Sequence, residues 1–415
     1  MAKITDSDAY RTTIVCIQTR MPSGEGMRRQ HVGPIRNALV VLFVLAIPHA
    51  AATTEWNADP WLELIIGPER VAEGDEIGCH GIPGTVLEEN PEAWVQACRD
   101  YVEARTPASR WSDSIVSFGA HPSTGVQNQL GGFGVAAMGD ITVTSNTSTS
   151  DIWSIGFSGG TLEKNVGDRE KVEQAAAAGG IVHMYWQALI EDVNVRRDRD
   201  LVDWLETSDA WHTTWGEAWS YSMLRNQTMN LTITEQHVIL ESPALTDRDD
   251  QRLWPVPTTV AITTGVSEVV SARFNDQDVE PWTNQKRVLE RGWRSNGQEV
   301  LVTLQPGDVV RLTMNGPVTP DEVSTRIPEW FDDKPWALTI AGLHVNDLRD
   351  WSAGFSDSPL RFTWLVEPQV EEERGPLLPI LAATIAVTTV VVAAIVLRKD
   401  RQQAAMAFDA WNEGE

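Results

Sequence analysis

Apolar residues are unevenly distributed along this chain, and the longest run without a charge covers residues 377–397. At a rise of about 1.5 Å per residue, a helix over this run spans the roughly 30 Å hydrocarbon core of a bilayer. Arg398, Lys399 and Arg401 follow the run, as is typical of a cytoplasmic flank. The pattern predicts a transmembrane helix over residues 377–397 and a cytoplasmic tail over residues 398–415.

A shorter apolar run covers residues 38–47, after Arg28, Arg29 and Arg36. This run is too short to span a bilayer, and the alanines that follow it fit a signal peptidase site. We therefore expect a signal peptide over residues 27–52 and a mis-assigned leader over residues 1–26. Signal and anchor together predict a type I protein of the cell membrane, held in the lipid bilayer by one helix with its amino end outside.

Helical and strand-like patterns mix between residues 53 and 222. Asn90 followed by Pro91 is typical of a helix start and predicts a helix over residues 91–105. A second, polar helix is predicted over residues 169–178, and short β-branched runs lie between the two helices. These patterns predict an α+β domain outside the membrane.

The pattern becomes that of β-strands after residue 226. Eight short β-branched stretches are separated by turn residues such as Pro306-Gly307, namely LTIT, VIL, TTVAITT, SEVVSARF, EVLVTL, DVVRLTM, WALTIAGL and RFTWLVE. Their spacing predicts an all-β, immunoglobulin-like sandwich over residues 226–367. An acidic stem over residues 368–376 then joins the sandwich to the predicted transmembrane helix.

The chain is strongly acidic, with a formal net charge of −25. Such a charge repels the phosphate backbone, so nucleic-acid binding is excluded. Carboxylates cluster in three places without forming a recognisable calcium loop. We expect these clusters to be solvated turns that hold neither a metal nor a cofactor, and calcium binding is the alternative. The clusters are Asp247, Asp249 and Asp250; Asp276, Asp278 and Glu280; and Asp332 and Asp333.

Two cysteines, Cys79 and Cys98, remain once the leader with Cys16 is removed. In an oxidising exterior such a pair predicts a disulfide. A free thiol or a metal pair completed by His80 is the alternative, but two cysteines and one histidine do not make a zinc site.

The stretch Gly156-Phe157-Ser158-Gly159-Gly160 matches the G-x-S-x-G pattern of serine hydrolases, which makes Ser158 a candidate nucleophile. That motif requires a helix directly after the serine, whereas Gly167 interrupts the following segment. A glycine-rich turn between strands is therefore the favoured interpretation. If Ser158 is catalytic, the candidate bases are His80, His121, His183 and His237.

Tryptophan is unusually frequent, with 18 residues in the chain. On a helix, Trp204, Trp211, Trp215 and Trp219 would form a stripe. Core packing explains the stripe, and an exposed aromatic platform for sugar rings or an apolar partner is the alternative. Separately, Asn146, Asn226 and Asn230 each begin an N-glycosylation sequon.

These features favour a cell-surface protein with a non-catalytic binding or adhesion ectodomain, whose partner is a carbohydrate or another protein. The alternative is an anchored extracellular hydrolase that uses Ser158 or an unassigned pair of carboxylates. A third interpretation is a structural envelope component without a small ligand.

Overall fold

The computed structural model divides the chain into two compact units, one within residues 54–374 and one formed by residues 1–53 with residues 375–415. The predicted leader, signal peptide and acidic stem lie outside the described residues. The structure describes residues 68–82, 85–120, 124–139, 147–149, 152–187, 197–246, 250–297, 299–343, 355, 358–366 and 377–412.

Ten strands of the first unit form one curled α/β half-barrel sheet. Their order is β4-β5-β3-β2-β1-β19-β18-β7-β6, with β8 beside β18, and all pairings are parallel except that of β4 with β5. The strands are β1 (Glu76–Cys79), β2 (Ser117–Phe118), β3 (Ala137–Gly139), β4 (Thr147–Thr149), β5 (Ile152–Ile155), β6 (Gly160–Thr161), β7 (Gly180–Gln187), β8 (Ala210–Thr213), β18 (Trp336–Leu343) and β19 (Phe362–Val366).

The predicted succession of an α+β domain and a separate eight-stranded sandwich is wrong, because the last two predicted sandwich strands belong to the parallel sheet. WALTIAGL is β18, which pairs in parallel with β7, β8 and β19. RFTWLVE contains β19, which pairs with β1 from Glu76↔Thr363 to Cys79↔Val366. All eight residues of β18 are buried, as expected for a strand covered on both faces.

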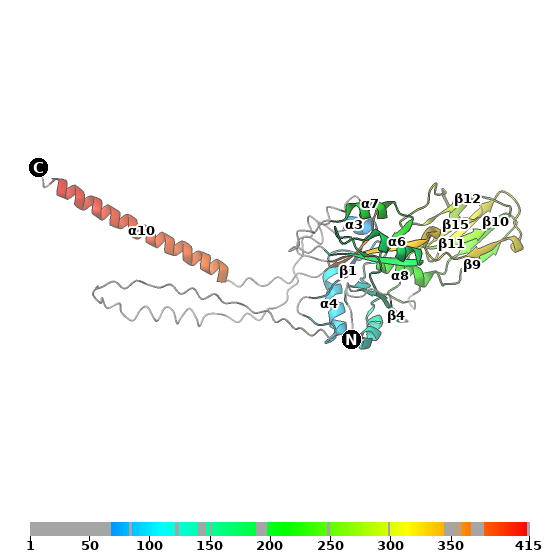
Figure 1. Ribbon diagram of the computed structural model, residues 1–415, viewed down its shortest axis with the longest axis horizontal. Helices are drawn as coiled ribbons and strands as arrows, with labels where there is room; N and C mark the ends of the chain where they lie inside the picture. Colours follow the sequence, from blue (N-terminus) through cyan, green and yellow to red (C-terminus); the bar gives the residue numbers. More distant parts are fainter. Residues whose placement is uncertain are drawn as a thin grey trace, which may run out of the picture. The chain divides into compact units, whose positions relative to one another are not determined.

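The remaining β-strands form two antiparallel sheets inserted between β8 and β18 (Figure 1). One sheet has the order β13-β12-β16-β10-β9 and the other the order β14-β15-β11-β17. Alternating residues such as Val260 and Val302 form the core between them. The strands are β9 (Asn230–Ile233), β10 (His237–Glu241), β11 (Thr258–Thr263), β12 (Val269–Phe274), β13 (Gln277–Val279), β14 (Gly292–Ser295), β15 (Val300–Leu304), β16 (Val309–Met314) and β17 (Ser324–Arg326).

Helices cover both faces of the parallel sheet. Successive strand residues point to opposite faces, so Met138 packs in the same cluster as α4 (Pro91–Glu103), whereas Ala137 packs with Trp215 of α8 (Trp215–Leu224). Asn90 caps α4 by accepting a hydrogen bond from the Ala93 N–H at 3.1 Å. The face with α4 also holds α3 (Pro68–Ala72), α5 (Thr124–Leu130), α6 (Arg169–Ala177) and α7 (Arg199–Thr207).

The second unit contains α10 (Leu377–Asn412), which runs 36 residues without ending at the basic cluster. The helix thus continues through most of the residues predicted as a cytoplasmic tail, as far as Asn412. Over the residues it describes, the structure contains no helix that is both long enough and apolar enough to cross a membrane. This finding contradicts the transmembrane helix predicted over residues 377–397.

Candidate functional site

A groove of about 510 Å³ opens where the inserted sheets meet the amino ends of β8 and β18. We call it the junction groove. Its walls are Thr207 and Asp209 before β8, side chains from residues 284–290 before β14, and Lys334 and Pro359 before β18 and β19. A volume of several hundred cubic ångströms suits a small-molecule site.

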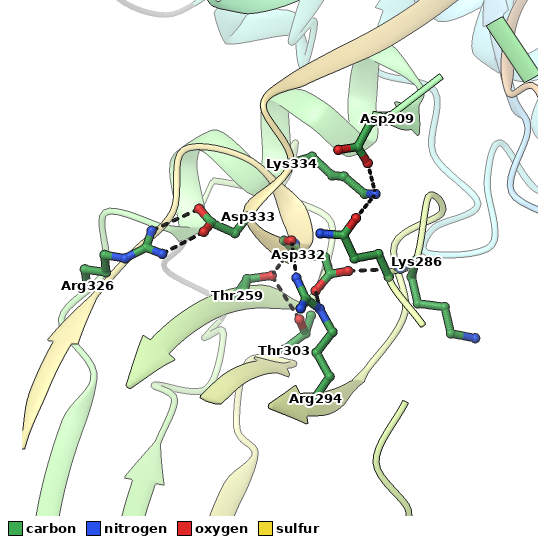
Figure 2. A network of polar contacts seen from close by, with 10 residues as sticks. Asp209, Thr259, Lys286, Arg294, Thr303, Arg326, Asp332, Asp333 and Lys334 are labelled. Atoms are coloured by element: carbon green, nitrogen blue, oxygen red, sulfur yellow. Dashed lines mark hydrogen bonds and ion pairs between the residues drawn. The ribbon is translucent and has the colours of Figure 1, made fainter. Parts of the chain in front are cut away.

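Lys334 anchors one wall of the groove. Its side chain is only 2% exposed, and its ammonium group donates to the Asp209 carboxylate at 2.5 Å and to Gln285 Oε1 at 3.1 Å (Figure 2). A buried charge is tolerated when it is paired and hydrogen-bonded. The lysine thus ties the amino end of β8 to the segment before β14, and it fixes both polar partners in the groove wall.

Asp332 supports the same wall through the backbone of Lys286. The residue adopts a left-handed conformation with φ of 52°, which an aspartate tolerates better than most residues. Its carboxylate accepts hydrogen bonds from Arg294 and from the backbone N–H of Lys286 at 2.9 Å. Its own N–H donates to Thr259 Oγ1 at 3.1 Å. These contacts fix the backbone at Lys286, whose side chain leads away from the network (Figure 2).

A second ion-pair network braces the turn beside Asp332. The Arg326 guanidinium bridges the carboxylates of Glu299 and Asp333 with four N–H donors, at distances of 2.6–3.0 Å. Two bidentate pairs on one guanidinium restrict its orientation. The turn that carries Asp332 and Asp333 is therefore held by both edge strands of the four-stranded sheet, through Arg294 of β14 and Arg326 of β17.

Charges of both signs face the junction groove. Lys286 pairs with Glu290 at 3.1 Å. The Arg287 guanidinium donates to the carbonyl oxygens of Glu206 and Thr207 at 2.8 and 3.1 Å, where the carboxyl end of α7 attracts positive charge. In a chain of net charge −25, a wall with three cations and two carboxylates is locally rich in positive charge.

A fully buried carboxyl group with a raised pKa lies elsewhere, beneath α8. Glu76 is fully buried, and it accepts hydrogen bonds from the Ser117 hydroxyl, from the Gly216 N–H at 2.9 Å and from the Thr363 hydroxyl at 3.2 Å. Burial raises the pKa of Glu76 to about 7, and these donors offset only part of the effect. We call these four residues the Glu76 cluster. Its position at the amino end of β1 and its lack of solvent contact fit a structural role.

Glu217 lies beside this cluster in the first turn of α8 and is 2% exposed. Its carboxylate accepts hydrogen bonds from the Trp111 ring N–H at 2.7 Å, the Thr213 hydroxyl at 3.0 Å and the Arg110 guanidinium at 3.2 Å. The carboxylate is thus engaged by three donors from two segments, so it is not available to a substrate.

The structure does not give Ser158 the surroundings of a nucleophile. Its hydroxyl accepts a weak hydrogen bond from the backbone N–H of His183 at 3.4 Å, and Gly160 begins a strand directly afterwards. The His183 ring instead contacts Thr339 Oγ1 at 2.6 Å, and burial lowers the pKa of this histidine to about 3. Among the described contacts none joins Ser158 to a histidine ring; His80 follows β1, His237 lies on β10, and His121 is not described.

The four predicted platform tryptophans do not share one surface. Trp211, Trp215 and Trp219 are buried in the cores around α8. Trp204 is partly exposed on α7, where it stacks on Trp336 with ring centroids 6.5 Å apart. Core packing thus accounts for three of the four residues.

The other predicted sites have the following positions. Cys79 and Cys98 form a disulfide between β1 and α4, with their Cα atoms 6.2 Å apart. Asn226 and Asn230 are exposed, while Asn146, Asp247 and Asp249 lie outside the described residues. In the described ranges, no three His, Cys, Asp or Glu side chains converge to hold a metal ion.

Comparison with known protein families, with curated proteins and with solved structures finds no match for this chain. The candidate site therefore rests on geometry alone. No signal in the sequence indicates this site, because Asp209 and Lys334 lie 125 residues apart and belong to no motif.

Proposed function

We propose that this protein is an exported, non-catalytic binding protein that holds a saccharide in the junction groove. The observation that carries the proposal is the chemistry of the groove wall, which offers a hydroxyl, two amides, three cations and two carboxylates within one concave surface. A ligand covered with hydroxyl groups can use donors and acceptors of this kind together.

A saccharide fits this wall better than a protein partner does. Protein interfaces gain most of their energy from buried aromatic and arginine anchors. The groove wall contains no aromatic residue, its arginine is engaged by the end of α7, and its apolar members are Val288 and Pro359. A small polar ligand is therefore the better match.

The carboxylates of the groove favour binding over hydrolysis. A glycosidase needs one carboxyl group as an acid and a second as a base or nucleophile. Asp209 and Glu290 are each paired with a lysine, at 2.5 and 3.1 Å. The groove also lies at the amino ends of parallel strands, whereas α/β enzymes place catalysis at the carboxyl ends.

Export is supported by the disulfide between Cys79 and Cys98, because such bonds persist in oxidising compartments and are rare in the cytoplasm. The predicted signal peptide agrees with this location. The acidic composition suits a soluble surface outside the cell.

A glycan array probed with the purified chain tests the proposal. Wild type should bind a limited set of saccharides, and Lys286→Glu should weaken that binding about tenfold or more, since a charged hydrogen bond contributes about 1.5–3 kcal/mol. Lys164→Glu makes the same charge change at an exposed turn outside the groove and should bind as wild type does. Equal weakening by both variants, or no binding by wild type, would contradict the proposal.

A further inference from the structure

The two antiparallel sheets have four edge strands, β9, β13, β14 and β17. Three of them carry a charged residue: Asp278 on β13, Arg294 on β14 and Arg326 on β17. Strand β9 has the sequence Asn-Leu-Thr-Ile and carries none. It is thus the exception among these edges.

An uncharged edge is a hazard for a β-protein. In the described residues β9 pairs only with β10, so its other side presents backbone N–H and C=O groups that another chain can pair with. Natural proteins block such edges with charges, prolines, bulges or a cover. Strand β9 contains neither a charge nor a proline, and its register with β10 is continuous from Asn230 to Ile233.

The sequon on β9 lies on the solvent side of the strand. Met229 and Ile233 pack against the core between the inserted sheets, so their side chains point inward. Leu231 lies between them with the same parity, but it is 36% exposed. Asn230 and Thr232 have the opposite parity, and both are exposed. The acceptor asparagine and the threonine that completes its sequon therefore stand on the same open face.

We propose that Asn230 carries an N-linked oligosaccharide and that this glycan shields the β9 edge. In the transfer, Asn230 Nδ2 forms a bond to the anomeric carbon of a lipid-linked oligosaccharide. The bond between that carbon and the lipid phosphate oxygen breaks, the phosphate leaves with the electron pair, and the amide loses one proton to a base. The glycan replaces the charge that the other edge strands carry.

The neighbouring sequon at Asn226 provides a contrast. The side-chain amide of Asn226 donates to the Ser222 carbonyl at 2.9 Å, at the end of α8, and the residue precedes β9. A glycan there would not stand on the strand. The assignment is therefore to Asn230, and Asn226 serves as the matched control.

Glycopeptide mass spectrometry of the full chain from its natural host tests the modification. The peptide with Asn230 should carry a sugar mass, and Asn230→Gln should lose it. An unmodified Asn230 in the exported wild-type chain would overturn the proposal, as would a glycan confined to Asn226.

Size-exclusion chromatography with light scattering tests the shielding. Asn230→Gln should shift the protein toward larger species as its concentration rises. Adding Thr232→Lys to that variant should restore the wild-type elution, because it supplies the missing edge charge. Asn226→Gln should elute as wild type does. An Asn230→Gln protein that elutes as wild type at every concentration would refute the shielding role.

Discussion

Replacing Glu76 with glutamine should change how stability depends on pH. Glutamine has nearly the shape of a protonated glutamate, so Glu76→Gln keeps an acceptor for the Gly216 N–H and removes only the ionisation. The side chain is fully buried, and it accepts hydrogen bonds from three neutral donors, on Ser117, Gly216 and Thr363. The variant therefore isolates the cost of a buried negative charge in the Glu76 cluster.

The magnitude follows from the pKa of Glu76 in the two states. Burial raises the pKa from 4.5 to about 7 on folding. A raised pKa gives a stabilisation that is fully present below about pH 4.5 and is lost as the pH rises through about 7. At about 1.4 kcal/mol per pH unit, this gap corresponds to about 3 kcal/mol.

The assay is urea unfolding followed by tryptophan fluorescence at several values between about pH 5 and pH 8. Other buried groups also titrate, because burial lowers the pKa of His183 to about 3 and that of His212 to about 4. Their stabilisation is present above pH 6.5 and is lost as the pH falls, which is the opposite sign. Both histidines occur in wild type and variant, so their effects cancel in the difference.

The unfolding free energy of Glu76→Gln minus that of wild type should rise by about 2.5 kcal/mol across this range. Glu76→Gln should thus be the more stable protein at about pH 8. A difference that stays constant with pH would refute the reasoning, because Glu76 would then ionise equally in both states.

Three further substitutions test the disulfide, the packing beside the Glu76 cluster and the ion pair that supports the junction groove. Cys79→Ser should lower the unfolding free energy by about 3 kcal/mol, since the disulfide closes a loop of 19 residues, and reductant should have the same effect on wild type. Gly216→Ala should lower the melting temperature, because a Cβ atom would lie 2.4 Å from Trp254 and overpacking costs about 1–3 kcal/mol. Asp332→Ala should cost about 3–5 kcal/mol in urea unfolding, because it leaves the buried Arg294 guanidinium without its carboxylate; a loss below about 1 kcal/mol would mean that water replaces the pair.

Local signals in the sequence identified several elements correctly. Asn90 and Pro91 predicted the start of α4, and the helix predicted over residues 169–178 is α6 (Arg169–Ala177). The inserted strands also follow their β-branched runs. These predictions succeed because caps and alternation act over a few residues.

The partners of the last two strands could not be read in the same way. Glu76 and Thr363 pair although 287 residues separate them, and nothing local to either strand specifies that contact. The one signal in the sequence was the nearly continuous apolar run of β18, which suits a strand covered on both faces of a parallel sheet and which the structure buries throughout. The sequence analysis instead assigned both strands to the sandwich, because the segments before them are also β-strands.

The candidate site could not be predicted either, because it also depends on contacts between distant segments. Asp209, Gln285 and Lys334 come from three segments that meet only after the inserted sheets dock on the parallel sheet. Ser158 is the opposite case: its motif is visible in the sequence, but the structure places no base beside it. A short motif indicates catalysis only where the fold places the other catalytic residues beside it.

The most direct test of the proposed function is calorimetric titration of the purified chain with the saccharide that binds best on the array, followed by mass analysis of the recovered ligand. Wild type should bind the saccharide saturably, Gln285→Ala should bind it more weakly, and the ligand should be recovered intact. A saccharide recovered in shorter pieces, or binding that Gln285→Ala leaves unchanged, would contradict a non-catalytic site in the junction groove.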